Sequence, residues 1–381
     1  MHFFIFYHFY QFYQIYHFYH FYRFFLAYIK KKFYLCTMSR FFVYIIIFFC
    51  IFIIVGMHAF YGIVAWVQNI RQKAKPRYLP YALVTIIGIA ITLSAISYGY
   101  YIGRWKLEKN RVELTYSSLP AVFDGYKIVH LSDLHLSTFI EHEEQLQRII
   151  DSVNTAQPDL ICFTGDLISL DTSEIRPLVP LLKTLRAKDG IYSVLGNHDF
   201  MLYGRERPNY DSIAAVMTRL ETELLGWRVL NNEHVTIHRG EDSITLAGCM
   251  NWSDLHFPLY SRSKHPPLQM GDIDKAIEGT TGFRLLLTHD PSLWHEQLLK
   301  AGRDDVALTL SGHTHCGQMR VGSWTPAQWF FDEVRGLYTS PNCSTSRPLY
   351  SPTLYVNTGL GCTAPFRLAV PMEVTVIVLR R

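Results

Sequence analysis

Two long stretches without a charged residue constrain this chain more than any other feature. Phe41–Val67 has 27 uncharged residues and Tyr78–Gly103 has 26. Each exceeds the roughly 20 apolar residues that a helix needs to cross a bilayer. The first is too long for the apolar part of a signal peptide and has no small-residue cleavage site after it. A buried core helix is the alternative for each stretch, but two in succession predict two transmembrane helices, at about 41–67 and 78–103.

Charge is distributed unevenly along the chain. Residues 1–107 contain no Asp or Glu, and the first acidic residue is Glu108. Of the 36 Lys and Arg, 11 precede Glu108, so residues 108–381 carry 25 basic side chains against all 32 acidic ones, a net charge of about −7. A nucleic-acid-binding protein needs its positive charge on the folded domain. We therefore expect no nucleic-acid partner.

The basic residues that flank the apolar runs bear on membrane orientation. The loop between the runs carries Arg71, Lys73, Lys75 and Arg77, and the outer flanks carry about twice as many if Lys30–Lys32 are counted. The positive-inside rule then places both ends in the cytoplasm, but without the N-terminal prefix the counts nearly balance and the side stays open.

The seven cysteines are scattered without CxxC spacing. They favour neither a disulfide framework nor structural zinc, and they favour a reducing compartment.

Residues 1–37 form a low-complexity aromatic prefix. From His8 to Phe25 the sequence repeats with a three-residue rhythm (HFY, QFY, QIY, HFY, HFY, RFF). Period 3 matches neither a helix face nor a strand face. One interpretation is a translated upstream stretch, with Met38 or Met57 as the working start. The other is an aromatic segment at the membrane surface.

The remainder divides into a membrane anchor, residues 38–111, and a globular domain, residues 112–381. Short apolar runs predict strands at 127–131, 160–163, 192–195, 243–246, 284–287, 306–310, 353–356 and 374–379. Helical patterns fall at 141–155, 174–186, 211–225 and 291–301. The early β-α-β alternation predicts an α/β fold with a helix-covered sheet, and the later strands predict a second, more antiparallel sheet. Residues 320–351 form a long irregular insertion, which is a candidate binding loop.

Polar motifs follow five of the predicted strands. In chain order they are Ser132–His135, Thr164–Leu167, Leu195–Asp199, Thr288–Pro291 and Ser311–His315. Each alone has a structural explanation, such as a turn, a helix cap or simple packing. Five in succession at strand ends instead predict carboxylates, an amide and imidazoles that converge at one edge. This donor set suits Mn, Fe or Zn.

These motifs resemble the calcineurin-like metallophosphoesterase superfamily, with its DxH, GDxx(D/R), GNH(D/E), lone His and GHxH pattern. The match covers Lys127–Gly361. It is most similar to the membrane-anchored YkuE/YaeI-like branch, on the residues Gly312–Gln318 and Asn357–Gly361. The resemblance implies a two-sheet αββα sandwich with two divalent metal ions.

Carried over from the family, the resemblance also implies a role for each site residue. One metal would be held by Asp133, His135 and His315, and the other by Asn197, His289 and His313. Asp166 would bridge the two metals. His198 would face the phosphate as general acid or transition-state clamp, and Asp199 would tune its position and charge.

Two positions depart from the family pattern. Ser169 stands where the family has an acidic or basic residue, so that role is absent or has moved, with Asp171 as a candidate. Cys316 replaces the glycine after the last histidine, which places a thiol near the metals.

The combined expectation is a membrane-anchored metal-dependent phosphoesterase or pyrophosphatase. The resemblance extends to the UDP-2,3-diacylglucosamine pyrophosphatases of lipid A synthesis, so the leading substrate is a phosphorylated lipid or nucleotide–lipid at a bacterial inner membrane, with the domain on the cytoplasmic face. A tethered phosphodiesterase for soluble nucleotides and a catalytically silent metal-binding scaffold are the alternatives.

Overall fold

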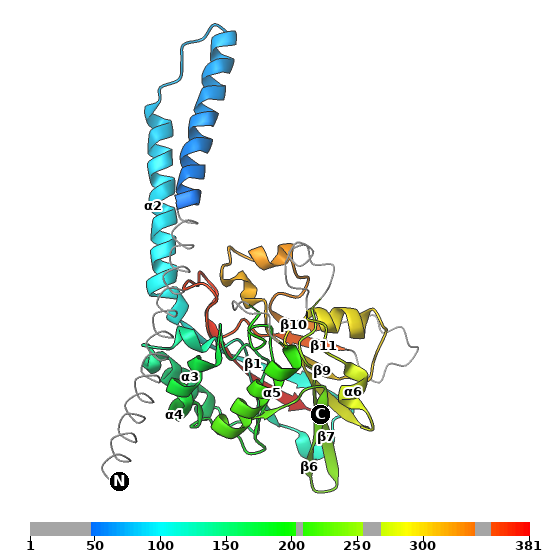
Figure 1. Cartoon of the computed structure of the whole chain (residues 1–381). Helices are drawn as coiled ribbons and strands as arrows, with labels where there is room; N and C mark the ends of the chain where they lie inside the picture. Colours follow the sequence, from blue (N-terminus) through cyan, green and yellow to red (C-terminus); the bar gives the residue numbers. More distant parts are fainter. Residues whose placement is uncertain (1–46, 203–208, 254–267, 340–351) are drawn as a thin grey trace, which may run out of the picture. The chain divides into compact units, whose positions relative to one another are not determined.

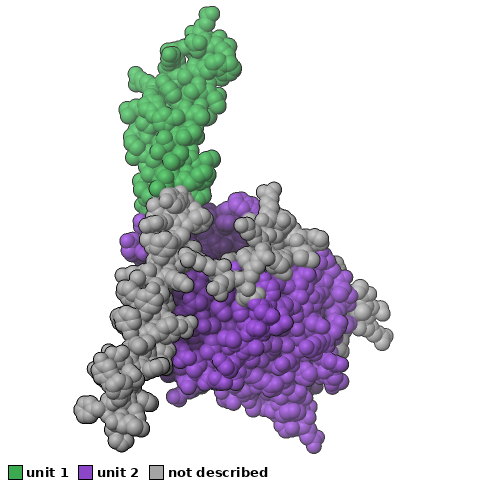
Figure 2. Space-filling model, in the orientation of Figure 1, with its two compact units in different colours: residues 1–96 green, residues 97–381 purple. Residues whose placement is uncertain are grey.

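The computed structural model describes residues 47–202, 209–253, 268–339 and 352–381 (Figure 1). The aromatic prefix, Met38 and the beginning of the first apolar run lie outside the described residues. The chain divides into two compact units, Met1–Ile96 and Ser97–Arg381, which Figure 2 shows in different colours.

Two apolar helices lead the described part of the chain. The first covers Ile47–Ile70; the second, α2 (Leu79–Tyr101), runs on into the 3₁₀ turn η1 (Gly103–Trp105). At about 1.5 Å per residue, each reaches across a hydrocarbon core of roughly 30 Å. Their large side chains point outward, with Phe52 67 % and Ile86 62 % exposed. The two predicted apolar runs are therefore helices that are long and apolar enough to cross a membrane.

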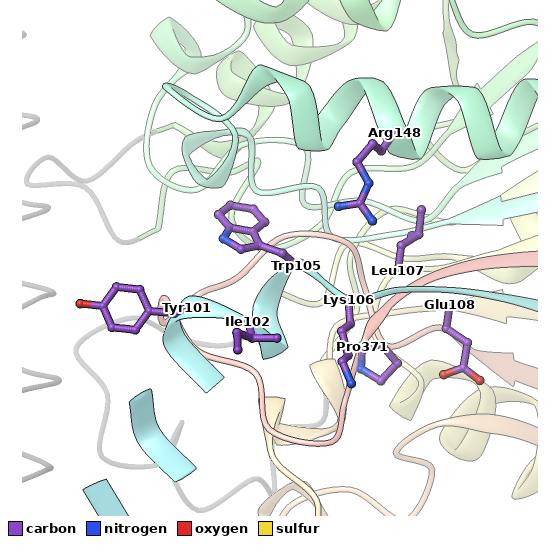
Figure 3. A pocket seen from close by; sticks show the side chains of 8 residues that line it. All are labelled: Tyr101, Ile102, Trp105, Lys106, Leu107, Glu108, Arg148 and Pro371. Carbon is purple, nitrogen blue, oxygen red and sulfur yellow. The ribbon is translucent and has the colours of Figure 1, made fainter. Parts of the chain in front are cut away.

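The C-terminal end of α2 belongs to the second unit and is fixed to it by backbone hydrogen bonds. Gly99 O accepts from the N–H of Arg367 at 3.2 Å, and Lys106 O accepts from the N–H of Met372 at 2.7 Å. A side chain at Gly99 would collide with the ring of Phe366, so the close approach requires glycine. A pocket of about 610 Å³ opens beside this junction (Figure 3).

The second unit contains two six-stranded sheets. The first has the order β1 (Leu107–Thr115), β12 (Met372–Arg380), β2 (Lys127–Leu131), β3 (Leu160–Phe163), β4 (Ile191–Ser193) and β5 (Arg228–Val229). The second has the order β10 (Gly336–Thr339), β11 (Thr353–Val356), β9 (Leu308–Ser311), β8 (Phe283–Leu287), β7 (Asp242–Gly248) and β6 (Glu233–Arg239). In the first sheet only β12 and β2 pair antiparallel. The second sheet is mixed, because its two outer pairs are antiparallel but its central pairs are parallel, so it is less antiparallel than the sequence suggested.

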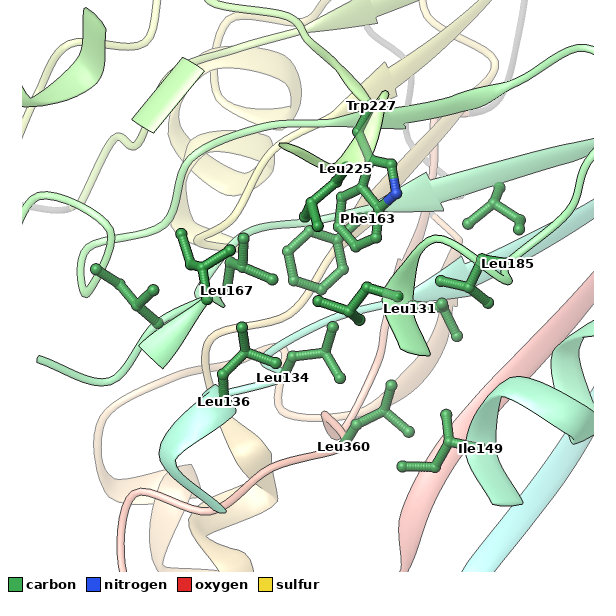
Figure 4. Packing of buried hydrophobic residues seen from close by; sticks show 14 of the residues in the cluster. Leu131, Leu134, Leu136, Ile149, Phe163, Leu167, Leu185, Leu225, Trp227 and Leu360 are labelled. Carbon is green, nitrogen blue, oxygen red and sulfur yellow. The ribbon is translucent and has the colours of Figure 1, made fainter. Parts of the chain in front are cut away.

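Alternating side chains on the strands separate the core into layers. On β3, Leu160 and Cys162 pack between the two sheets, whereas Ile161 and Phe163 pack on the opposite face beneath helices (Figure 4). A third cluster, which includes Trp294, covers the outer face of the second sheet. The result is a helix–sheet–sheet–helix sandwich, which confirms the predicted fold class.

The helices differ in detail from the sequence prediction. The helix α3 (Glu143–Thr155) agrees with it, and α5 (Tyr210–Leu220) continues into a π-helical turn, η6 (Glu221–Leu225). The predicted helix at 174–186 is wrong as a continuous element. It consists of the turns η4 (Thr172–Glu174) and η5 (Arg176–Leu178) and the short α4 (Val179–Leu182), because Pro177 and Pro180 lack the N–H that a helix interior needs. Similarly, the helix predicted at 291–301 is the shorter π-helical turn η8 (Trp294–Leu299), and α6 (Ile273–Ile277) was not predicted.

Candidate metal centre

The seven side chains predicted as metal ligands lie in loops that begin where strands end. Asp133 and His135 follow β2, Asp166 follows β3, Asn197 follows β4, His289 follows β8, and His313 and His315 follow β9. Within each sheet these strands pair in parallel, so their carboxyl ends share one edge. The structure brings together all seven residues, from both sheets.

The backbone at this edge is strained. Five of the seven residues adopt the left-handed conformation, with φ of 51° at Asp133, 42° at His135, 58° at Asp166, 69° at His313 and 46° at His315. A non-glycine residue in that region costs about 1–2 kcal/mol. Neighbouring loops hold the conformation, since Asp133 N donates to Gly165 O at 2.9 Å and His135 N donates to Asp166 O at 3.0 Å. Strain maintained by surrounding structure is typical of functional sites.

Gly312 allows the loop after β9 to approach the loop after β2. A Cβ atom at this position would collide with the side chains of Ser132 and Asp133. The next residue, His313, donates its N–H to Asp133 Oδ2 at 3.1 Å. The glycine of the last motif is therefore needed to join the two sheets at the site.

The first group of donor atoms belongs to Asp133, His135 and His315. The Nε2 atoms of the two histidines lie 3.0 Å apart, and His315 Nε2 lies 3.3 Å from Asp133 Oδ1. Asp133 is fully buried, and its Oδ1 has no hydrogen-bond partner. Leaving a buried carboxylate oxygen unsatisfied is costly. A cation among these three atoms would satisfy it.

The second group belongs to Asp166, Asn197, His289 and His313. His289 Nε2 lies 3.2 Å from Asp166 Oδ2, 3.0 Å from Asn197 Oδ1 and 3.1 Å from His313 Nδ1. Asp166 Oδ2 is also 3.6 Å from His135 Nε2 in the first group. One carboxylate therefore stands between the two groups.

Charge states in the cluster favour cation binding. Burial, together with the neighbouring His198, lowers the pKa of His135 to about 3, and burial lowers the pKa of His315 well below its usual value. Both imidazoles are thus neutral at neutral pH and have a free lone pair. His289 differs, because burial alone would lower its pKa but the Asp166 carboxylate outweighs burial and raises that pKa to about 10, so a metal ion would have to displace a proton from this ring. Carboxylates and imidazoles clustered in this way are suited to divalent metal ions.

His198 lies beside the first donor group, where its ring forms a third potential metal-holding group with His135 and Asp166, the donor atoms all within 4.8 Å of one another. Its ring is 4.6 Å from the ring of His135, and its Nδ1 lies 2.7 Å from Ser169 O. The side chain of Asp199, which we expected to tune His198, accepts from the backbone N–H groups of Asp166 and Gly196, both at 2.8 Å. Asp199 therefore holds the loop that carries Asp166.

The two positions that depart from the family pattern have structural partners. Ser169 supplies the carbonyl that faces His198, and its Oγ lies 2.5 Å from Ser137 Oγ. Asp171 caps η4, because its Oδ1 accepts from Ser173 N at 2.8 Å. Cys316 is buried, and in the described part of the chain its thiol belongs to none of the groups that could hold a metal.

Sequence reasoning missed Arg367. Its guanidinium is fully buried and donates to carbonyl oxygens of the turn Thr358–Gly361 at distances from 2.6 to 3.1 Å. Its Nη2 also lies 3.4 Å from His315 Nδ1. The same turn donates the Gly361 N–H to Asp133 O at 2.7 Å. A lone arginine soon after Asn357–Gly361 carried no pattern that would have revealed this contact.

Asp290 was missed for a different reason. Its Oδ2 lies 3.5 Å from His313 Nε2, on the opposite side of the ring from Nδ1, and its Oδ1 accepts from Ser292 N at 2.9 Å. A carboxylate behind a ligand histidine orients the ring. The signal was present, because Asp290 follows His289 directly in the sequence, but the residue that it faces is distant in the chain.

Comparisons with known proteins agree with this geometry. The sequence model of the family described as "Calcineurin-like phosphoesterase" matches residues 126–317, the range that contains all seven candidate ligands. A Bacillus subtilis protein named metallophosphoesterase YkuE is 33 % identical over 288 residues, which cover 74 % of this chain and 90 % of that protein.

Two further relatives differ in length and in what their names state. A Danio rerio "Transmembrane protein with metallophosphoesterase domain" is 30 % identical over 304 residues, 78 % of this chain and 63 % of that protein. This chain thus spans less than two thirds of the Danio rerio relative. "UDP-2,3-diacylglucosamine pyrophosphatase LpxG" of Chlamydia trachomatis is 27 % identical over 307 residues, 70 % of this chain and 89 % of that protein.

We predict that Asp166→Asn lowers metal content more than any other single substitution in the cluster. The neutral amide would remove the negative charge that both donor groups share, whereas any other ligand belongs to one group. Elemental analysis of the purified full chain measures this directly. Asp211→Asn, which removes an exposed carboxylate on α5, is the charge-matched control. Wild-type metal content in Asp166→Asn would show that this carboxylate does not bridge two ions.

Proposed function

Because this chain belongs to the calcineurin-like phosphoesterase family, whose members are metal-dependent hydrolases, we propose that it is a membrane-anchored phosphoesterase that cleaves a phosphoester or pyrophosphate bond of a lipid-linked substrate. The observation that carries the proposal is the position of Asp166 between two groups of donor atoms. Asp133, His135 and His315 would hold one divalent ion; Asn197, His289 and His313 would hold the other. Two such ions would supply charge stabilisation on phosphate oxygens and activation of water.

The proposed catalytic role of His198 follows from its hydrogen bond. A carbonyl oxygen can only accept, so the contact with Ser169 O requires a proton on His198 Nδ1. The proton that the ring can exchange is therefore the one at Nε2. When Nε2 also carries a proton, the ring can donate that proton to a leaving alkoxide and remain neutral with Nδ1 still bonded to Ser169 O. Asp199 would act indirectly, by fixing the loop between Asp166 and Ile168 through their N–H groups.

We expect His198→Ala to lower kcat by about 10²–10⁴-fold while metal content stays at the wild-type level, because general acid catalysis typically contributes that much. Turnover of bis-p-nitrophenyl phosphate and elemental analysis, made on the same preparation, separate the two effects. The control is His238→Ala, on an exposed position of β6. Loss of metal together with rate would identify His198 as a ligand, and an unchanged kcat would remove it from the chemistry.

The proposed substrate class rests on an apolar surface that begins beside the cluster. The ring of Phe331 lies 5.4 Å from the ring of His313, and the neighbouring Phe330 and Trp329 are 42 % and 70 % exposed. Trp324 extends this surface, with its ring 5.3 Å from that of Trp329. All four belong to the insertion predicted as a binding loop, which the structure describes as far as Thr339. Such a surface suits an acyl chain attached to the phosphorylated group.

The name of the Chlamydia trachomatis relative supports the same substrate class, since UDP-2,3-diacylglucosamine carries both a pyrophosphate and acyl chains. We place the reaction at the cytoplasmic face of a bacterial inner membrane. The basic flanks of the apolar runs favour that side when Lys30–Lys32 of the prefix are counted. The buried cysteines Cys162, Cys249, Cys316 and Cys362 are all unpaired, which suits a reducing compartment.

We predict a higher kcat/KM for UDP-2,3-diacylglucosamine than for its deacylated counterpart, and a preference that falls about tenfold in the double variant Trp329→Ser, Phe330→Ser. A tenfold change corresponds to a combined contribution of roughly 1.4 kcal/mol from the two aromatic side chains to binding the acyl chains. The control variant, Val122→Ser with Val216→Ser, removes two exposed apolar side chains elsewhere. Equal kcat/KM for the two substrates in the wild type would contradict the lipid-linked substrate and favour the alternative, a tethered enzyme that acts on soluble substrates.

A further inference from the structure

The pocket at the end of α2 lies outside the metal cluster, and nothing in the proposed reaction uses it. It has a volume of about 610 Å³ and is formed by residues from the end of α2, from η1 and β1, by Arg148 of α3 and by Pro371 (Figure 3). Its lining combines two cations, Lys106 and Arg148, with one carboxylate, Glu108.

The two cations are available to an anion. Within the described residues neither forms an ion pair. Arg148 Nη1 donates to the neutral Gln145 Oε1 at 2.5 Å, and Lys106 Nζ lies 5.5 Å from the centre of the Tyr98 ring. In Figure 3 the guanidinium of Arg148 extends from α3 towards Trp105 and Lys106, and Glu108 lies to the other side of Lys106. The pocket therefore has a net positive charge of one.

The other part of the lining is apolar and strongly exposed. Tyr101 is 72 % exposed and Ile102 is 53 % exposed, and Trp105 closes the pocket on this side. Aromatic side chains with an apolar body and a polar tip are enriched where a membrane helix meets water. The apolar span Leu79–Trp105 ends at the same residues, so in a chain inserted through this span the pocket would open where the span leaves the bilayer core.

We propose that this pocket binds the headgroup of an anionic phospholipid. The phosphodiester would lie between Lys106 and Arg148, and the acyl chains would leave along Tyr101 and Ile102. Juxtamembrane cations attract anionic lipids in this way. The single excess positive charge matches a phosphodiester, which carries one negative charge, better than a phosphate monoester. The site would hold the end of α2 at the headgroup level, and this does not depend on the reaction that the metal cluster performs.

Native mass spectrometry of the full chain, released from detergent micelles that contain equal amounts of phosphatidylglycerol and phosphatidylcholine, tests the proposal. The wild type should retain one phosphatidylglycerol in preference to phosphatidylcholine. Lys106→Gln with Arg148→Gln should lower that preference by about tenfold or more, since each juxtamembrane cation strengthens the binding of an anionic lipid by about fivefold. Lys109→Gln with Arg111→Gln is the control, because it removes two cations of β1 that do not line the pocket.

Four outcomes decide the question. Loss of the preference in the pocket variant alone supports the site. Equal retention of both lipids by the wild type, or equal loss in both double variants, would overturn it, since a general attraction of anions to a basic surface would then suffice. A third arm adds soluble glycerol phosphate. Displacement of the lipid by this competitor at comparable concentration would show a simple anion site, and would also overturn the proposal.

Discussion

The position of one carboxylate, Asp166, is the feature on which the rest of the site depends. Its Oδ2 faces His289 in one donor group and His135 in the other. Buried charges of this kind are stable only when they are paired or bind cations. Hydrogen bonds from the surrounding backbone hold this residue in place. The side chain of Asp199 accepts from the backbone N–H of Asp166, and the backbone N–H of His198 donates to Asp166 Oδ1 at 2.8 Å. A change that moved this side chain would disrupt both groups together.

The two-sheet topology explains how donors from distant parts of the chain reach that carboxylate. Strands β2, β3 and β4 deliver loops from one sheet, and β8 and β9 deliver loops from the other. Gly312 permits contact between the two sets of loops. The buried Arg367 donates to Gly361 O, and the N–H of Gly361 in turn donates to Asp133 O. The backbone N–H of Arg367 also donates to Gly99 O, so the end of the apolar helix α2 and the candidate metal centre are supported by the same short segment.

What could be predicted from the sequence was local. Buried strands such as β3 are short apolar runs, and the polar motifs that follow them contain all seven residues that lie together in the structure; the resemblance to the family selected those seven from the motifs. The strand β1 was missed because it contains four polar residues in succession, Glu108–Arg111, which interrupt any apolar pattern, and because it is defined by pairing with β12 at the other end of the chain. Arg367, Asp290 and the pocket beside α2 depend in the same way on contacts between residues far apart in sequence. Single-chain patterns do not encode such contacts.

We propose above all that Asp166 joins two metal ions. Anomalous X-ray scattering from crystals of the full chain grown with Mn²⁺ tests it most directly. We predict two anomalous peaks about 3.5–4 Å apart on either side of Asp166, one beside His135 and the other beside His289. A single peak, or two peaks of which only one contacts Asp166, would contradict the claim.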